Sequence, residues 1–210
     1  MTGRFITFEG TEGGGKSTQI DLLAKRLRER GLTVRTLREP GGTPIGEEIR
    51  HTLQHSAQNE AMTAEAELLL LNASRAQLVR EVIRPALKAG EIVICDRFYD
   101  STTAYQGYGR ALDLQLVRTV TDMAVGATRP DLTILLHIPV NVSEARRKSR
   151  PAAGRDRMEE LDHAFFERVE QGFSAIAAAE PKRVRVLDAT QPIERVHDQI
   201  WALVAPLVKS

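Results

Sequence analysis

The sequence predicts an α/β fold in which a parallel sheet of about five strands is flanked by helices. Short apolar runs alternate with longer segments of helical periodicity along most of the chain. A glycine-rich stretch at residues 10–17 separates the first apolar run from the first helical segment. The 210 residues are 42% hydrophobic and 27% charged, which is typical of a soluble globular protein. We therefore expect a single domain over residues 1–210, with a small insert at about 146–157.

The N-terminal half begins with apolar, β-prone residues at 5–8, which predict a buried strand. Ile20, Leu23 and Leu27 recur at helical spacing after the glycines, and Arg30-Gly31 is typical of a helix end. The next expected elements are a strand at 32–37, a helix at 45–53, a helix at 63–87 broken at Pro85, and a buried strand at 91–95.

The C-terminal half continues the alternation. Residues 100–109 form a polar, aromatic segment that fits a loop or a helix. The remaining expected elements are helices at 113–125, 141–148, 161–179 and 193–208 and strands at 132–138 and 184–188. Ligands of such sheets bind beyond the carboxyl ends of the strands. That rule places residues 10–17, 38–43, 96–97 and 188 at one edge of the molecule.

Composition and charge exclude several classes of protein. The chain has 29 Lys and Arg against 28 Asp and Glu, so no overall charge attracts it to nucleic acid or a membrane. Its one cysteine, Cys95, lies in an apolar run, which excludes an internal disulfide and predicts a buried, inert thiol. The five histidines lack the spacing of a zinc site, and His51 and His55 are expected to be solvated. With no leader and no apolar run of membrane-spanning length, we expect a cytoplasmic protein.

Residues 10–17 match G-x-x-x-x-G-K-[ST], the pattern of a phosphate-binding loop. A strand before the loop and a helix after it aim backbone N–H groups and the positive end of a helix dipole at polyphosphate. Lys16 supplies a charge for the β- and γ-phosphates of ATP, and the Ser17 hydroxyl is placed to bind Mg²⁺. The alternative is a glycine-rich turn that fits by chance, and the flanking elements argue against it. The predicted ATP-binding residues are Gly10, Thr11, Glu12, Gly13, Gly14, Gly15, Lys16, Ser17 and Thr18.

Asp96 and Arg97 directly follow the strand predicted at 91–95. An acid there lies beside the phosphate loop and can hold Mg²⁺ or its waters, as a Walker-B acid does. The alternative is a solvated ion pair at a strand end. A second substrate could be contacted by Arg75, Arg97, Tyr105 and Tyr108, although solvated arginines and core-capping tyrosines explain these residues equally well.

Residues 146–157 carry six basic side chains against one acid, Asp156, which gives a local charge of +5. The middle of this segment, residues 149–154, is loop-like. A hinged basic lid suits phosphoryl transfer because arginines stabilise negative charge on the transferred group. A solvated helix face or a patch for an anionic partner is the alternative, and the phosphate loop in the same chain favours the lid.

In combination, five stretches make the chain resemble the thymidylate kinase family, whose members phosphorylate dTMP to dTDP with ATP. They are FEG with GKS (8–17), REPGGT (38–43), DR with ST and AYQG (96–107), RPDLT (129–133) and DATQP (188–192). The stretches follow the family order over nearly the whole chain, and the second and third are specific to this family. The resemblance implies the fold of a P-loop nucleoside monophosphate kinase, ATP and dTMP as substrates, Mg²⁺ as the metal, and a homodimer.

The resemblance also implies roles for single residues. Glu12 is similar to the acid that meets the 3′-hydroxyl of the acceptor sugar, and Arg38 and Arg97 are similar to the pair near the acceptor phosphate. Arg75 resembles the residue that donates to the thymine carbonyl, and Tyr105 resembles the ring that crowds a ribose 2′-hydroxyl. The positions that match the surroundings of the two bases are Ser101, Thr102 and Gln106 for thymine and residues 188–191 for adenine.

Two positions distinguish this chain within the resemblance. One branch of the family carries a catalytic arginine in the phosphate loop, where this chain has Gly13, so the chain resembles the branch with catalytic arginines in the lid. The expected catalytic residues are Lys16, Asp96, Arg97, Arg150 and Arg155. Leu71 stands where the family usually has a phenylalanine that stacks on thymine. Leucine loses about 0.5–1.5 kcal/mol of aromatic stacking, which bears on base selectivity.

Two other functions stay open on the sequence. A kinase with a different acceptor, such as dUMP, a modified pyrimidine nucleotide or a nucleoside, would keep most of these features. A nucleotide sensor that binds ATP without transfer belongs to a different class, and the intact Lys16, Ser17 and Asp96 argue against it. The apolar run at 68–71 fits either the core or a subunit interface, and the core is the default.

Overall fold

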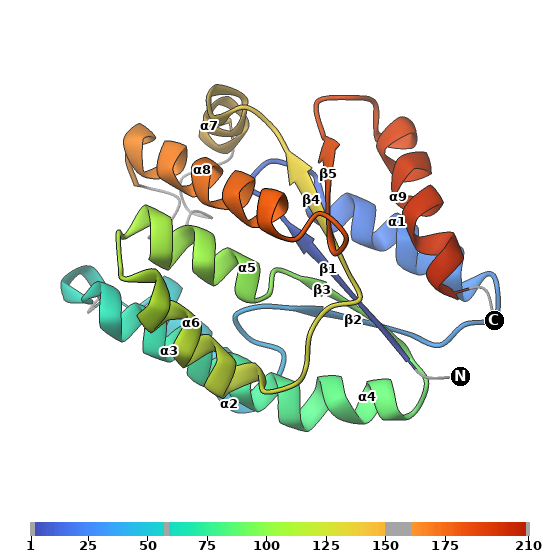
Figure 1. Cartoon of the computed structure of the whole chain (residues 1–210), viewed down its shortest axis with the longest axis horizontal. Helices are drawn as coiled ribbons and strands as arrows, with labels where there is room; N and C mark the ends of the chain where they lie inside the picture. Colours follow the sequence, from blue (N-terminus) through green and yellow to red (C-terminus); the bar gives the residue numbers. More distant parts are fainter. Residues whose placement is uncertain (1–2, 57–58, 150–160, 209–210) are drawn as a thin grey trace.

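The computed structural model describes residues 3–56, 59–149 and 161–208 and contains a parallel sheet of five strands in the order β2-β3-β1-β4-β5 (Figure 1). The predicted parallel α/β class is therefore confirmed. The strands are β1 (Arg4–Glu9), β2 (Val34–Arg38), β3 (Ile92–Asp96), β4 (Leu132–His137) and β5 (Val184–Asp188).

Helices connect the strands and cover both faces of the sheet. The α-helices are α1 (Lys16–Arg28), α2 (Pro44–Gln54), α3 (Ala64–Leu78), α4 (Arg84–Lys88), α5 (Tyr99–Thr102), α6 (Leu114–Val125), α7 (Val140–Lys148), α8 (His163–Ala179) and α9 (Ile193–Val208). Three further helical segments are η1 (Asn59–Ala61), a 3₁₀ turn, and the π-helical η2 (Val79–Ile83) and η3 (Thr103–Gly109).

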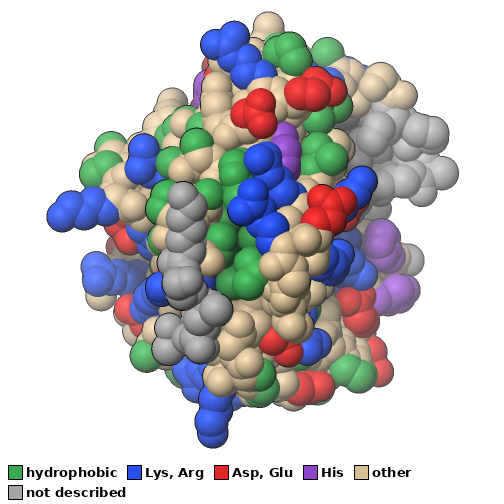
Figure 2. All heavy atoms as spheres, turned by 90° about the vertical axis from the view of Figure 1, so that its right-hand side faces the viewer, with side chains coloured by type: hydrophobic (Ala, Val, Ile, Leu, Met, Phe, Trp, Pro, Cys, Tyr) green, Lys and Arg blue, Asp and Glu red, His purple; other side chains and the backbone are tan. Residues whose placement is uncertain are grey.

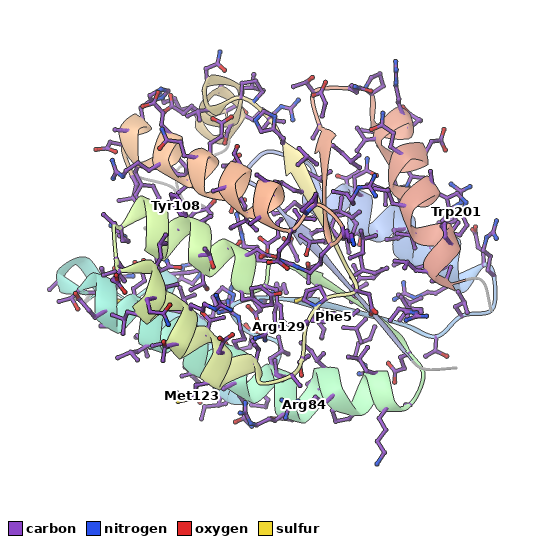
Figure 3. The ribbon with its side chains drawn as sticks, in the orientation of Figure 1. Phe5, Arg84, Tyr108, Met123, Arg129 and Trp201 are labelled. Atoms are coloured by element: carbon purple, nitrogen blue, oxygen red, sulfur yellow. The ribbon has the colours of Figure 1, made fainter. Side chains whose placement is uncertain are left out.

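The central strands are buried on both faces, as parallel strands under helices usually are. Ile6 and Phe8 of β1 pack with α1 and α9 in one core cluster. Phe5, on the opposite face of the same strand, packs with η2, α4 and α6 in a second cluster (Figure 3). A third cluster joins η3 and α8 around Phe165. The alternation of side chains along β1 therefore holds two helical layers against the sheet.

The sheet register brings the carboxyl ends of the strands to a common edge. Asp96 pairs with Phe8 on one side and with Arg38 on the other, because β3 lies between β1 and β2. On the far side of β1, Glu9 pairs with Leu135. The residues that the sequence assigns to this edge from three separate segments are thus neighbours in space.

Strand β2 begins two residues later than the sequence predicts, at Val34 rather than at residue 32. Gly31 adopts a left-handed conformation with φ of 77°, and the Leu32 N–H donates to Leu27 O at 3.2 Å. Leu32 is therefore used to close the end of α1. The prediction missed this because an apolar residue after a helix fits a strand equally well.

Pro85 does not break the helical segment, contrary to the expectation from sequence. Helix α3 continues through η2 into α4, where Pro85 lies in the first turn. In η2 the Arg84 N–H donates to Val79 O, five residues back. The π turn shifts the backbone pairing just before the proline, which lacks an N–H of its own, so the chain stays helical.

Residues 100–109 are helical, which decides between the two expectations for that segment. Cys95 is fully buried, as predicted, and burial raises the pKa of its thiol well above the ordinary value. Among the described residues, no helix is long and apolar enough to cross a membrane. Basic and acidic side chains are interspersed on the face shown in Figure 2.

Helix α8 approaches η3 closely at Gly172. A Cβ added at Gly172 would lie 2.9 Å from ring atoms of Tyr108 and 3.0 Å from the Ala104 Cα. Glycine at this position lets the backbones of the two elements pack directly against each other. Helix α8 thereby holds η3 in place by direct contact.

We expect Gly172→Ala to lower the melting temperature, although the same change in an open helix stabilises by about 0.5–1 kcal/mol. The added methyl group has to displace Tyr108 or the η3 backbone, and overpacking of this kind costs about 1–3 kcal/mol. Thermal unfolding followed by circular dichroism measures the effect. Ser174→Ala, at an exposed position of the same helix, is the control and should change little. A Gly172→Ala protein as stable as the wild type would contradict the close approach.

Candidate active site

The glycine-rich loop runs from the end of β1 to the start of α1, in the predicted order of strand, loop and helix. Gly10 has φ of 125°, and a Cβ there would overlap the Leu136 carbonyl, so only glycine fits. Lys16 is the first residue of α1 and is buried. Its Nζ donates to Gly10 O and Thr11 O, both at 3.1 Å, and thus folds the loop around the ammonium group. Burial lowers the pKa of Lys16, and Arg97 adds to the effect.

Arg97 lies across this loop and joins it to the segment after β3. Its Nη2 pairs with the Glu12 carboxylate of the loop and donates to the Tyr105 hydroxyl at 3.3 Å. Its Nη1 donates to Ser101 Oγ at 2.9 Å. The guanidinium carbon also lies 5.0 Å from the centre of the Tyr105 ring. The alternative of a solvated Asp-Arg pair is therefore wrong for Arg97, whose side chain is mostly buried.

Glu9 lies beneath Arg97 at the end of β1 and is fully buried. One carboxylate oxygen accepts from the Phe98 N–H at 2.7 Å and the other from Ser101 Oγ at 2.5 Å. Ser101 therefore connects Glu9 to the guanidinium of Arg97. Burial raises the pKa of Glu9 from an ordinary 4.5 to about 8, and the nearby charge of Asp100 contributes.

Arg75 belongs to a second buried cluster on the side of α3. Its Nε donates to Glu39 Oε2 at 2.8 Å and its Nη1 to Asn72 Oδ1 at 3.0 Å. Its Nη2 lies 2.7 Å from the same Glu39 oxygen and donates to Phe98 O at 3.3 Å. Arg75 is 2% exposed, so the alternative of a solvated helical arginine is wrong. Burial raises the pKa of Glu39, and the charge of Arg75 opposes the shift.

The α5–η3 segment presents the other predicted acceptor residues. Gln106 is buried, and its Nε2 donates to Glu67 Oε1 at 2.8 Å. Thr102 and Ser101 are buried on the same segment, and Tyr105 packs edge-on against Phe165. The structure therefore brings Arg97 together with Ser101 and Tyr105, and it joins Arg75 to the start of the same segment at Phe98. Leu71 is half-buried on α3, one turn before Arg75.

A cavity of about 460 Å³ opens between the N-terminal part of α1 and the end of β2. The polar residues that line it include Ser17, Asp21, Arg38, Glu47 and Asp96. Asp96 Oδ1 is buried and has no hydrogen-bond partner among the described residues. Within that part of the chain, no group of three or more His, Cys, Asp or Glu side chains could hold a metal ion. Because Ser17 and Asp96 line the same cavity and the buried Asp96 Oδ1 has no partner among the described residues, the two side chains fit Mg²⁺, which is usually held by one or two protein oxygens together with phosphate and water.

The predicted lid is described only in its first residues. Helix α7 lies over the phosphate loop, where Ser143 Oγ donates to Glu12 O and Arg146 Nη1 donates to Gly13 O, both at 2.7 Å. A Cβ added at Gly13 would lie 3.0 Å from the Arg146 Cβ. Arg150 and Arg155 lie outside the described residues.

The comparisons with known proteins agree with this geometry. A family profile described as thymidylate kinase matches residues 8–200. The chain is 51% identical over 210 residues to a thymidylate kinase of Pseudomonas fluorescens, and the match covers 100% of this chain and 98% of the relative. It is 50% identical over 204 residues to a thymidylate kinase of Alcanivorax borkumensis, with 97% of each chain covered. The chain belongs to the thymidylate kinase family.

A solved structure supports the same assignment. The crystal structure of thymidylate kinase from Ehrlichia chaffeensis aligns with a TM-score of 0.78 at 35% identity, covering 97% of this chain and 99% of that one. The expected fold of a P-loop nucleoside monophosphate kinase is thereby confirmed.

The loop at residues 188–191 lies at the end of β5 on the same edge as the phosphate loop. Asp188 Oδ1 accepts from the Thr190 N–H at 2.9 Å and from Thr190 Oγ1 at 2.6 Å. These bonds lower the pKa of Asp188 and close the turn. The turn leads directly into α9.

Several site residues escaped the sequence analysis. Glu9, Glu39 and Glu67 are buried acids whose carboxylates bind groups that the sequence did single out. Glu9 and Glu39 each stand within a stretch that carries the family resemblance, FEG and REPGGT, but their partners are distant in sequence. A signal was available only for Glu9, since an acid that ends an otherwise apolar strand predicts a buried carboxyl at the functional edge.

Glu9 should make stability depend on pH. The folded state keeps the Glu9 proton up to about pH 8, whereas the unfolded chain loses it near 4.5. The stability that this group contributes is therefore complete below pH 4.5 and is lost as the pH rises toward 8. We expect the wild type to lose stability relative to Glu9→Gln by up to about 1.4 kcal/mol per pH unit in that window.

Thermal unfolding of both proteins between pH 5 and pH 9 measures this difference. Glu48→Gln removes an exposed carboxylate and serves as the control, for which the difference from wild type should not change with pH. A difference between the wild type and Glu9→Gln that stays constant over this range would contradict the assignment.

Proposed function

We propose that this chain transfers the γ-phosphoryl group of ATP to dTMP in the presence of Mg²⁺, giving dTDP and ADP. The observation that carries the proposal is the position of Arg97. Its guanidinium contacts Glu12 of the phosphate loop on one side and Ser101 and Tyr105 of the α5–η3 segment on the other. A single cation thus lies between the phosphate loop and the α5–η3 segment, where it can neutralise negative charge on a transferred phosphoryl group.

On the donor side, the phosphates of ATP lie along the loop and the N-terminus of α1. Lys16 contacts the β- and γ-phosphates in exchange for its present bonds to the loop carbonyls. Mg²⁺ held by Ser17 and Asp96 would neutralise charge on the same phosphates. In this proposal the 188–191 turn, at the end of β5, lies next to the adenine base.

On the acceptor side, Arg38 and Arg97 hold the dTMP phosphate and Glu12 meets the sugar 3′-hydroxyl. Arg75 donates to the thymine carbonyl, and its ion pair with Glu39 fixes the guanidinium before the substrate arrives. Around the nucleoside lie Leu71, Ser101, Thr102, Tyr105 and Gln106. Tyr105 is held edge-on by Phe165, so its ring is rigid where it would crowd a 2′-hydroxyl.

The chemical step needs no strong general base, because the attacking oxygen of the dTMP phosphate is already anionic. That oxygen forms a bond to the γ-phosphorus as the bond to the β–γ bridging oxygen breaks, and ADP leaves. The chain contributes positioning and neutralisation of charge by Lys16 and Arg97. Residues 146–157 act as a lid that excludes water, so the acceptor rather than solvent is phosphorylated.

We assign the catalytic lid arginines to Arg150 and Arg155, in the manner of the family branch that lacks an arginine in the loop. The packing at Gly13 supports this assignment. Gly13 has φ of 81°, and the Arg146 side chain occupies the space next to its Cα. The positive φ and the tight contact with Arg146 both disfavour a side chain at residue 13, which fits a chain whose catalytic arginines lie in the lid.

Turnover with a panel of acceptors tests the proposal. ADP release with Mg²⁺ and ATP should be fastest with dTMP when it is compared with dUMP, dCMP, dGMP and UMP. Lys16→Ala should abolish it, because one cation that contacts the transferred group contributes a factor of about 100 or more. Similar turnover with several pyrimidine nucleotides would contradict the thymine specificity and would indicate that Leu71 does not replace the stacking phenylalanine. Trapped ATP without acceptor-dependent turnover would favour a nucleotide sensor.

We also propose that the protein acts as a cytoplasmic homodimer. Helices α3 and α6 pack against each other and expose Leu69, Leu116 and Met123, of which Met123 is 73% exposed (Figure 3). Exposed apolar side chains on adjacent helices are typical of a subunit interface.

Sedimentation velocity should give a dimer for the wild type and a monomer for Met123→Asp, because a charge in an apolar interface would be left without a partner. Val186→Asp, at an exposed apolar position on β5, is the control and should remain dimeric. A monomeric wild type would overturn the dimer.

A further inference from the structure

Arg38 is the last residue of β2 and is half exposed at the edge of the cavity. Its Nη2 donates to Glu47 Oε2 at 3.0 Å and its Nη1 to Pro40 O at 3.3 Å. A guanidinium has five N–H groups. Three N–H groups of Arg38 are therefore left without a partner in the described part of the chain.

Glu47 is itself held in place by the loop and the helix around it. Its second oxygen, Oε1, accepts from the Gly42 N–H at 2.7 Å. Glu47 lies in the first turn of α2, whose N-cap Thr43 accepts from the Gly46 N–H at 3.0 Å. The helix dipole favours a carboxylate at this end. The Gly42 N–H and Arg38 both lower the pKa of Glu47, so it stays ionised at neutral pH.

The loop between β2 and α2 leaves room for this ion pair because residue 41 is a glycine. Gly41 has φ of 126°, and a Cβ there would overlap Glu47 Oε1 and lie 2.7 Å from Arg38 Nη1. The side chains of Arg38 and Glu47 thus pass through space that any other residue at position 41 would occupy.

The ion pair contributes little to stability. The two side chains are 50% and 44% exposed, and ion pairs in water contribute little to folding because solvent screens them. A geometric function accounts better for a pair that is fixed by a helix N-terminus, a backbone N–H and a glycine.

We propose that Glu47 is a positioning residue for the acceptor phosphate. Glu47 holds the Arg38 guanidinium at the cavity and leaves three of its N–H groups free for an anionic oxygen. The proposal rests on the function proposed above, in which Arg38 binds the dTMP phosphate. The alternative is that Glu47 competes with the phosphate for Arg38, in which case removing the Glu47 charge would increase the affinity for dTMP.

Glu47→Gln keeps the size of the side chain and removes its charge, and Glu48→Gln removes the same charge one residue further along the exposed surface of α2. We expect Glu47→Gln to raise the KM and the Kd for dTMP by about five- to tenfold, as for the loss of an oriented contact. The KM for ATP, kcat and the melting temperature should stay within about twofold or a few degrees of wild type. Glu48→Gln should leave all of these unchanged.

A double-mutant cycle shows whether Glu47 acts through Arg38. In the Arg38→Ala background, Glu47→Gln should add less than about a twofold change, because the group that it positions is gone. A Glu47→Gln protein with unchanged or lower KM for dTMP, or a full effect without Arg38, would overturn the proposal. If the wild type neither binds nor phosphorylates dTMP, the proposed function fails with it, whereas an active wild type and an unchanged Glu47→Gln protein overturn this inference alone.

Discussion

The site depends on the turn that the chain makes at Arg97, where β3 ends. Arg97 has a left-handed backbone conformation with φ of 66°, which costs a residue other than glycine about 1–2 kcal/mol. Two bonds to β1 offset this cost, since the Arg97 N–H donates to Phe8 O and the Phe98 N–H donates to the Glu9 carboxylate. Without the turn, the Arg97 side chain would follow the strand and leave the loop. With it, the guanidinium reaches Glu12, and the end of β3 is joined to the phosphate loop.

Buried acids lie behind the groups that face the proposed acceptor. The pairs are Glu9 with Ser101, Glu39 with Arg75, and Glu67 with Gln106. Burying a carboxylate carries a desolvation cost that an ion pair offsets only in good geometry, so burial of these acids is weak evidence of added stability. Their common effect is to hold a hydrogen-bond donor (Ser101 or Gln106) or a cation (Arg75) in place before the substrate binds. The groups that face the proposed acceptor are therefore preorganised by buried hydrogen bonds and ion pairs, so they are ordered on folding rather than at each turnover.

The sequence predicts those parts of the molecule that depend on neighbouring residues. The strand at 91–95 and the phosphate loop can be predicted because apolar runs and glycine spacing are local properties of the sequence. The family motifs add the likeness of Arg75 and Arg97 to known site residues, but not the contacts that hold them. The partner of Arg75 is Glu39, 36 residues away, and the partner of Gln106 is Glu67, 39 residues away. Such pairs are set by tertiary packing, as is the π turn that lets the helix continue past Pro85.

Glu12 links the phosphate loop and Arg97 to α7, the helix in which the basic segment 146–157 begins. Its carboxylate contacts Arg97, while its main-chain carbonyl accepts from Ser143 Oγ of α7 at 2.7 Å. Its second carboxylate oxygen lies 3.9 Å from the Lys16 Nζ. Because one residue makes all three contacts, α7, Lys16 and Arg97 are joined through Glu12 directly and not through a chain of intermediate residues. The loop is therefore joined to α7 and to Arg97 through a single peptide unit and its side chain.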